Sequence, residues 1–588
     1  MAVPQQRRAM TASLASPIGG WNARDSLAEM NPLDAVQMVN FFPTPTDVTL
    51  RKGYTKTSTG ITGEVLSLMN YSSPTVNKLF ASTDAAIWDA STSTATSAMT
   101  VTDGKMIHAM ITTSGGSFLL AVNGVDPMSV YDGTRWSRSA TTATAQSISS
   151  ITRGGTGNLT ATLTTGSAHG LVSGNLVTIT GATPSQFNGT YRITVTGAST
   201  FTYTMATAPS GDATIMGSYT IVYSVLGVNS NTFATVNLFK ERLYFVQKNS
   251  LDFWYLPVDS ISGTATKFPL GGIFKKGGYL QAMGTWTIDA GYGVDDLAVF
   301  ITSNGEVAVY KGSDPSDAND WSLIGIWNIG QTYSRKCTFK YGGDMLILTE
   351  DGLVPLSAGL QSTRLDPRVN ITDKIFYAIS QAADLYAQNY GWQINYYAKY
   401  NMLIVNIPVT EGQEQYVMHN ITKSWARFTD VLANCWELSG DDMYFGGDGY
   451  VARFYDAFAD DSQNINGFVQ QAYSYFDRRG QQKRFTMIRP ILQTDNGLPT
   501  VLCGISTDFD TVSLNNQISF NPINNQLGAW DTGVWDTSLW GGNLSISRLW
   551  QGVTGIGYAA SISMNVASQG IEFHWASTDY VMEQGGVL

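Results

Sequence analysis

The sequence repeats one short pattern many times: an apolar run, a short polar turn, and a second apolar run. Examples are FLLAVNGVDPMSVYDG, AVFITSNGEVAVYKG, MLILTEDGLVPLS and MYFGGDGYVARFYD. Asn-Gly and Asp-Gly at such turns favour positive φ, which suits the tight reversal of a β-hairpin. The pattern therefore predicts an all-β chain built from antiparallel hairpins.

The spacing of these turns narrows the prediction. In the second half of the chain the turns fall at Asn304, Asp351, Asn401 and Asp448, so they are 47, 50 and 47 residues apart. Repeats of about 40–50 residues built from antiparallel strands are typical of propeller blades. We therefore predict a multi-bladed β-propeller of six or seven blades, a rigid disc suited to a scaffold or binding platform.

Changes in composition divide the chain into five regions. Residues 1–60 are predicted to form an extended N-terminal arm. The hairpin pattern fills residues 61–145 and 220–465, which we expect to form the two parts of the propeller. Residues 146–219 are rich in Thr, Ser, Gly and Ala yet keep strand alternation, as in YRITV, which predicts a small inserted β-module. Residues 466–588 are predicted to form a C-terminal β domain.

Three segments depart from the hairpin pattern. Within 372–390, apolar residues at helical spacing predict a helix with Thr372 as its N-cap. A short helix is also predicted over 32–39, with Asn31 as its N-cap. The run AWDTGVWDTSLWGG, with Trp every five residues, has neither strand nor helix periodicity and predicts an aromatic loop.

The sequence contains no recognisable catalytic or metal-binding motif. Cys337, Cys435 and Cys503 are too far apart for a zinc or redox motif, and the four histidines lack metal-ligand spacing. Phosphate-loop, HExxH and GxSxG motifs are absent. The N-terminus has no apolar signal region, and no apolar run reaches 18 residues, so no membrane-spanning helix is expected. We therefore expect a protein that is no enzyme, has no cofactor, and is made in the cytoplasm.

The net negative charge argues against a protein that binds nucleic acid tightly. Its formal net charge is −11, from 35 Lys and Arg against 46 Asp and Glu, whereas nucleic-acid-binding surfaces carry a basic footprint. The densest basic stretch is a candidate patch for contacts with phosphates or with another subunit, and its alternative interpretation is a solvated hairpin. The patch comprises Arg478, Arg479, Lys483 and Arg484.

Several long phrases resemble one phage family. GGWNARDSLAEMNPLDAVQMVNFFPTPTDVTLRKGY resembles the N-terminal segment of the tail nozzle proteins of short-tailed phages, also called packaged-DNA stabilisation proteins or tail tubular protein B. RLYFVQKNSLDFWYLPVDSISG, KFPLGGIFKKGGYLQAMGTWT and DDLAVFITSNGEVAVYKGSDPS resemble the propeller of that family. The resemblance covers about residues 18–60 and 230–460, and it is weaker over the C-terminal 120 residues.

The resemblance implies a structural protein of the virion. Such a protein forms a homo-hexameric ring at the distal end of a short tail, docks under the adaptor ring below the portal, and contacts tail fibres or a tail needle. Its lumen retains double-stranded DNA and then conducts it during ejection. Few charges suit large subunit interfaces, and net acidity suits a lumen through which DNA slides.

Two sets of residues are candidates for these roles. The arm has many large apolar side chains for a segment outside the predicted blades, so we expect it to contact neighbouring subunits or the adaptor. The candidate contact residues are Trp21, Arg24, Asp25, Phe41, Phe42 and Tyr54. Two loops are candidates for a constriction of the channel, and their charged residues are Lys275, Lys276, Asp295 and Asp296.

A second interpretation belongs to another class of protein. A tail-tip propeller that binds or degrades glycans would also be rich in β-strands and aromatic residues. Such a site needs clustered Trp and, for hydrolysis, two carboxylates about 5–9 Å apart. A nozzle needs a ring of six subunits, so the oligomeric state separates the two interpretations.

Overall fold

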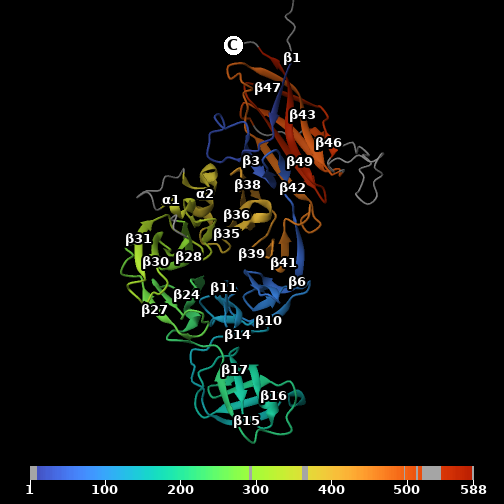
Figure 1. Cartoon of the computed structure of the whole chain (residues 1–588). Coiled ribbons are helices and arrows are strands. Elements are labelled where there is room, and N and C mark those ends of the chain that lie inside the picture. The colour runs from blue at the N-terminus through green and yellow to red at the C-terminus, as the bar shows by residue number, and fades with distance from the viewer. Residues whose placement is uncertain are drawn as a thin grey trace, which may run out of the picture.

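The computed structural model describes residues 9–289, 294–359, 369–495, 497–510, 514, 516–518 and 545–585. Three β-rich parts lie in a row: a sandwich, a propeller and a small lobe (Figure 1). Both ends of the described chain lie in the sandwich, because β1 (Ala9–Ala15) pairs with β49 (Phe573–Gln584). The predicted aromatic loop, AWDTGVWDTSLWGG, lies outside the described residues.

The propeller consists of antiparallel sheets of three or four strands each. The first four sheets are β7 (Ser67–Ser72), β8 (Asn77–Ser82), β9 (Ala86–Asp89) and β10 (Thr96–Thr100); β11 (Ile107–Thr113), β12 (Gly116–Val122), β13 (Ser129–Tyr131) and β14 (Trp136–Arg138); β23 (Phe233–Phe239), β24 (Arg242–Gln247), β25 (Asp252–Tyr255) and β27 (Thr266–Pro269); and β28 (Leu280–Asp289), β29 (Val294–Thr302), β30 (Glu306–Lys311) and β31 (Ser322–Asn328). The remaining three are β32 (Thr338–Tyr341), β33 (Asp344–Thr349) and β34 (Gly352–Pro355); β35 (Gln393–Tyr397), β36 (Met402–Val409), β37 (Gly412–His419) and β38 (Trp425–Phe428); and β39 (Cys435–Ser439), β40 (Asp442–Gly446) and β41 (Asp448–Phe454) with β6 (Tyr54–Glu64).

These seven sheets close into a ring within the described part of the chain. The first strand of each sheet contacts the first strand of the next, in the order β7, β11, β23, β28, β32, β35 and β39, and β39 contacts β7 again. Apolar clusters lie between neighbouring sheets, such as the cluster of Met69, Phe80, Leu119 and Trp136 between the first two. The prediction of a β-propeller is therefore confirmed.

The last sheet is completed by a strand from the other end of the chain. β6 pairs antiparallel with β41 and forms the outer strand of that sheet. The predicted boundary of an arm at residue 60 is therefore wrong, because hydrogen bonding carries β6 across it as part of a blade. This pairing ties residues 54–64 to residues 448–454.

The small lobe lies between the second and third sheets of the propeller. Its two sheets are formed by β15 (Ile148–Gly154), β16 (Thr160–Thr165), β20 (Thr200–Thr204) and β19 (Thr194–Gly197), and by β18 (Gly189–Arg192), β17 (Leu176–Thr180) and β21 (Ser218–Ile221). It has its own apolar cluster, which includes Leu163, Phe187 and Phe201. At its base, the short strands β22 (Val225–Leu226) and β26 (Gly263–Thr264) pair in parallel. The lobe therefore projects from the propeller as a unit with a separate core (Figure 1).

The sandwich is built from both ends of the chain. One sheet contains β1, β4 (Phe41–Pro43), β5 (Val48–Leu50), β43 (Lys483–Thr494), β46 (Ser545–Ser547), β47 (Gln551–Gly557) and β49. The other contains β2 (Gly20–Trp21), β3 (Asp34–Val39), β42 (Ile465–Gln471), β44 (Thr500–Thr507), β45 (Asn516–Ile518) and β48 (Ala560–Ser568). This second sheet continues into the propeller, because Val39 of β3 pairs with Arg427 of β38.

Helices are short and few in the described chain. They are α1 (Leu356–Gly359), α2 (Phe376–Tyr386) and 3₁₀ turns at Thr156–Asn158, Ser185–Phe187, Ser230–Thr232, Asp373–Ile375 and Ala398–Tyr400. α2 confirms the helix predicted within 372–390, but Thr372 does not cap it: its hydroxyl accepts a hydrogen bond from the Leu353 amide at 3.1 Å. The helix predicted over 32–39 is wrong, since this segment forms strand β3. None of the described helices has the length and hydropathy needed to span a membrane.

Candidate functional site

The described residues offer no candidate metal centre. No group of three or more His, Cys, Asp or Glu side chains among them is placed to hold a metal ion. Cys337, Cys435 and Cys503 are free and buried, and burial raises the pKa of each thiol to about 12. A thiol with so high a pKa is a poor nucleophile.

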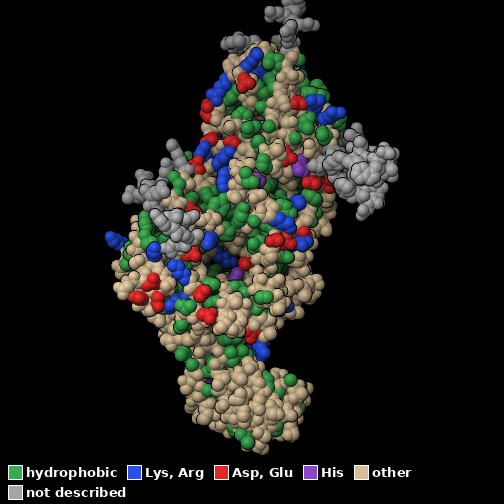
Figure 2. All heavy atoms as spheres, in the orientation of Figure 1, with side chains coloured by type: hydrophobic (Ala, Val, Ile, Leu, Met, Phe, Trp, Pro, Cys, Tyr) green, Lys and Arg blue, Asp and Glu red, His purple; other side chains and the backbone are tan. Residues whose placement is uncertain are grey.

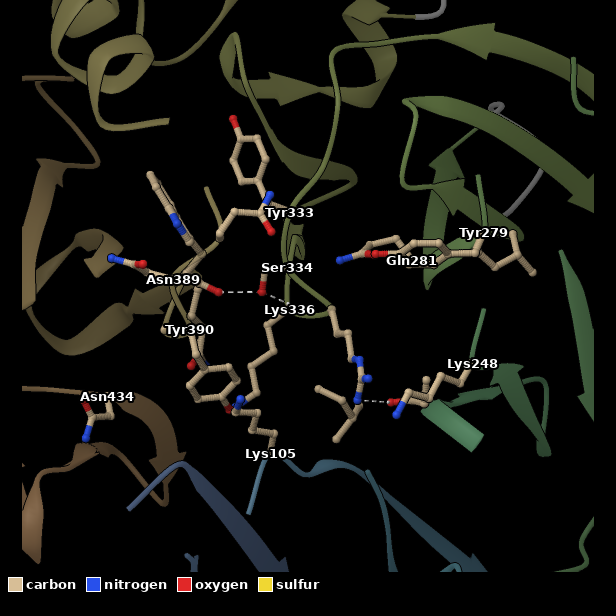
Figure 3. Close-up of a pocket in the computed structure, with 18 of the residues that line it drawn as sticks. Lys105, Lys248, Tyr279, Gln281, Tyr333, Ser334, Lys336, Asn389, Tyr390 and Asn434 are labelled. Atoms are coloured by element: carbon tan, nitrogen blue, oxygen red, sulfur yellow. Dashed lines mark hydrogen bonds between the residues drawn. The ribbon is translucent and has the colours of Figure 1, made fainter. Parts of the chain in front are cut away.

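The feature that stands out is a pocket at one mouth of the propeller axis. Its volume is about 260 Å³, and it is lined by residues that lie at or just before the innermost strands of six sheets (Figure 3). These include Ile107 in β11, Ala234 in β23, Gln281 in β28, Gln393 in β35 and Asn434 before β39. The pocket therefore exists because the ring brings together linkers that are far apart in the sequence.

The charges of this pocket all have one sign. Lys105, Lys248, Arg335 and Lys336 line it, and none of its described lining residues is Asp or Glu. None of these four cations takes part in an ion pair with a described carboxylate. In a chain with a net charge of −11, such a cluster creates a local positive potential. We call Lys105, Lys248, Arg335 and Lys336 the axial cations. Figure 2 shows basic side chains inside the hollow over the propeller.

Arg335 and Lys105 are positioned by contacts with other parts of the ring. The Arg335 guanidinium donates to the carbonyl of Asn123 at 3.0 Å, and the Ser334 hydroxyl donates to the carbonyl of Trp392 at 2.7 Å. The Lys105 ammonium lies 5.1 Å from the ring centroid of Tyr390, a cation–π distance. The segment that carries Arg335 is therefore attached to two other blades and not free in solution.

Tyr390 and its neighbours form one wall of the pocket. The Tyr390 hydroxyl donates to the carbonyl of Leu66 at 2.6 Å, which joins the α2–β35 linker to the first blade. In Figure 3 Lys105 and Lys336 converge beside Tyr390, and Gln281 points toward them from the opposite side. The wall and the axial cations thus face one common space.

Behind the pocket, the axis continues as a cavity of about 430 Å³. It is lined by the innermost strands, and at its wall Nε2 of His108 lies 3.4 Å from the carboxylate of Glu437. A DNA duplex, whose major groove alone is about 12 Å wide, does not fit such a cavity. The propeller axis of one subunit is therefore no passage for double-stranded DNA.

The two predicted gate loops lie at opposite ends of one blade. The amides of Lys275 and Lys276 donate to the Glu306 carboxylate at 2.8–3.0 Å, near the start of β28, and their side chains are exposed. Asp296 accepts a hydrogen bond from Thr287, near the other end of β28. The strand length between these ends is about 20 Å. The side chain of Asp295 lies outside the description, and none of the other three lines the axial pocket.

The predicted assembly arm is largely buried within its own chain. Phe41 and Phe42 are 0% and 4% exposed and belong to the core of the sandwich, so the prediction that they contact another subunit is wrong. The ring of Trp21 packs edge-on against Tyr416 at 5.1 Å, and that of Tyr54 packs against Phe445 at 5.0 Å. The aromatic side chains of the arm therefore pack against strands of the same chain.

The two charged residues of that arm are also paired inside the chain. Arg24 forms ion pairs with Asp25 and with Asp373, which precedes α2. The hydrogen bond from Arg24 and a second one from Asn22 lower the pKa of Asp25 below its usual value. Arg24 and Asp25 therefore fix the N-terminal segment to the propeller side of the molecule.

The predicted basic patch is not one exposed cationic face. Lys483 is 2% exposed, and its ammonium donates to the carbonyls of Arg478, Gln481 and Tyr558 at 2.7–2.9 Å. Lys483 is therefore a structural residue that holds a turn, which corrects its assignment as a contact residue. Of the other three, Arg478 bonds to Gln481, Arg479 pairs with Glu29 at 3.0 Å, and Arg484 lies 3.8 Å from Glu583.

The axial cations were missed from the sequence because they are single residues spread over more than 200 positions. The signal that could have identified them is their place in linkers. Lys105, Arg335 and Lys336 each occur within a few residues of a strand that opens a new sheet. Such linkers meet at the axis of any propeller.

Comparisons with known proteins inform the fold alone. No protein-family model matches the sequence, and no curated protein matches it. Among solved structures, the chain is similar to YCF48 from Cyanidioschyzon merolae, with 11% identity over 68% of this chain and 98% of that one, and a TM-score of 0.24. It is also similar to the C-terminal WD40 domain of Sif2, with 10% identity, coverage of 68% and 99%, and a TM-score of 0.30. At these scores the architecture rests on the strand pairing described above.

Proposed function

We propose that this chain is the subunit of the nozzle ring of a short phage tail, which retains the genome and then conducts it during ejection. Its partners in this proposal are other copies of itself in a hexamer, the adaptor ring below the portal, tail fibres or a tail needle, and double-stranded DNA in the lumen. The proposal rests on the sequence resemblance, and features of the fold support it.

The supporting observation is the size of the propeller axis. Because the cavity of about 430 Å³ excludes a duplex, DNA requires a passage between subunits. A ring of several elongated chains supplies one. The three-part shape suits a tube wall in which the sandwich, propeller and small lobe follow one another along the passage (Figure 1).

The surface offers a candidate subunit contact in place of the arm. β31 is the edge strand of its sheet, and Leu323 and Ile324 on it are 40% and 50% exposed. An uncovered edge strand with neighbouring apolar side chains favours association with another chain. We therefore assign the outer edge of this blade to the contact between subunits.

The small lobe fits the role of a tip. Between residues 146 and 221 the charged side chains are Arg153, Arg192 and Asp212, and the lobe is nearly free of blue and red in Figure 2. A surface with so few charges neither attracts nor repels phosphates strongly. DNA leaving the ring would pass such a lobe without being held.

The oligomeric state tests the proposal. Native mass spectrometry and negative-stain imaging of the purified chain are expected to show six-fold rings, alone or after addition of the adaptor protein. Ile324→Lys on the β31 edge is expected to reduce ring formation, whereas Lys340→Ala, on an inner strand, leaves it unchanged. A chain that stays monomeric with the adaptor present contradicts the nozzle and favours the glycan-active propeller.

A further inference from the structure

The axial cations lie around one small pocket. Lys105, Lys248, Arg335 and Lys336 line a pocket of about 260 Å³ with no described carboxylate among its lining residues. Lys105 and Lys248 are exposed, and Arg335 and Lys336 are half-buried. Four positive charges around one pocket create a positive potential that attracts an anion. The electrostatics of the pocket therefore specify an anionic ligand.

Neutral polar groups share the same space. Gln281 is 6% exposed, and its side-chain amide has no hydrogen-bond partner among the described residues. Asn249 and Gln388 also line the pocket. An amide group donates and accepts hydrogen bonds, so it pairs with hydroxyl groups, which do the same. These three amides specify a ligand that carries hydroxyl groups besides its charge.

Two aromatic rings complete the lining. Tyr279 and Tyr390 are 41% and 37% exposed and belong to different linkers. The Tyr390 hydroxyl is bonded to Leu66 and its ring contacts Lys105, so Tyr279 is the ring that offers an apolar face with a polar tip. Such a face suits a ligand that has an apolar ring face bordered by polar groups. The volume lies just below that of pockets for drug-sized ligands, about 300–1,000 Å³. It suits a molecule of about one sugar ring.

We propose that this pocket binds a small hydroxylated anion, a sugar phosphate or a sugar acid. The axial cations contact its phosphate or carboxylate group, with Arg335 able to bind it in a bidentate manner. Gln281 and its neighbouring amides contact the hydroxyl groups. This inference is independent of the nozzle proposal, because it concerns the axis of a single subunit.

Isothermal titration calorimetry of the full chain at low salt tests the proposal. The probes are glucose 6-phosphate and glucuronic acid, with glucose and inorganic phosphate as references. We expect one or both anionic sugars to bind more tightly than glucose and than inorganic phosphate, and to bind more weakly as salt is added. The comparison of the two anionic sugars tells whether the charged group is a phosphate or a carboxylate.

Variants locate the binding. Lys336→Ala and Lys248→Ala are each expected to weaken binding by about tenfold or more, since a hydrogen bond to a charged group is lost. Lys336→Arg keeps the charge and is expected to retain most of the affinity, which separates a loss of contact from a loss of folding. Lys340→Ala, an exposed lysine outside the pocket, is the matched control. The proposal is overturned if neither anionic sugar binds, or if glucose or inorganic phosphate binds as tightly as the anionic sugars. It is also overturned if Lys336→Ala and Lys248→Ala bind the anionic sugars with the same affinity as the control.

Discussion

The buried side chain of Arg51 allows a direct test of which interactions anchor the N-terminal segment to the rest of the chain. Its side chain is 0% exposed and pairs with Asp460, which is 7% exposed, through two bonds of 2.8 and 2.6 Å. The same guanidinium donates to Asn40, to the carbonyl of Lys52 and to the carbonyl of Thr429. All five hydrogen-bond donors of the guanidinium are close to acceptors, so Arg51 joins the sandwich, the sixth blade and the loop after the last blade.

The expected cost of Arg51→Ala follows from this geometry. Removing one member of a buried pair leaves the other charge desolvated and unpaired, which costs about 3–5 kcal/mol. The neighbouring pair of Lys56 and Asp461 is 35% and 36% exposed, and breaking an exposed pair costs about 0–1 kcal/mol. Lys56→Ala is therefore the matched control.

Hydrogen exchange followed by mass spectrometry measures this cost locally. The amide of Arg51 donates to the carbonyl of Asn40 at 2.9 Å, so a peptide covering residues 40–54 reports the opening of this segment. We expect Arg51→Ala to raise its exchange rate by about 10²–10³-fold or more, and Lys56→Ala to raise it by less than about tenfold. Replacing the pair by Arg51→Met with Asp460→Leu is expected to restore much of the protection. Equal exchange in the two single variants would refute the reasoning.

Three further predictions concern other parts of the fold. Burial alone would lower the pKa of His574, but hydrogen bonds to Asp47 and a second carboxylate raise it above 6.5. The interaction of protonated His574 with these carboxylates therefore stabilises the sandwich below pH 6.5, and this stabilisation is lost as the pH rises through the elevated pKa. His574→Gln is expected to flatten the difference in free energy of unfolding between pH 6 and pH 8, and an unchanged difference would contradict this. Replacing residues 142–222 by a Gly-Ser linker is expected to keep the propeller folded and to cost about 2 kcal/mol in denaturant titrations, because Leu176 packs into the propeller's core; loss of cooperative unfolding would show that the lobe belongs to that core. Gly53→Ala would place a methyl group 2.0 Å from a backbone carbonyl oxygen, so we expect a lower melting temperature than the wild type, and an equal one would show that the backbone relaxes freely.

Local chemistry made the propeller predictable, but the regular spacing was partly misleading. Asn304 and Asp351 join the second and third strands of their sheets, whereas Asn401 joins the first and second. The first step of 47 residues therefore compares like hairpins, whereas the step of 50 and the second step of 47 compare different ones. The innermost strands begin at residues 280, 338, 393 and 435, which are less evenly spaced.

The N-terminal segment was not predictable, because its partners lie far away in the sequence. Residues 34–39 were predicted to be helical, yet they pair with β42 and β38. Asn31, expected as a helix cap, instead accepts a hydrogen bond from the Leu33 amide at 2.9 Å in a local turn. Strand pairing over more than 380 residues leaves no local pattern, and tertiary contacts override intrinsic propensity. The axial pocket was missed for the same reason.

The closing strand of the ring has a consequence for how the protein is made. β6 is synthesised about 370 residues before β39, the first strand of the sheet that it completes. At roughly 5–20 residues per second, β6 waits on the order of 20–70 s on the ribosome without its partner. Its sequence, YTKTSTGITGE, has few large apolar side chains and one lysine. Both features disfavour aggregation of an unpaired strand with other chains. The composition of this strand thus suits its delayed pairing as well as its final place, and the ring closes only after nearly four fifths of the chain has emerged.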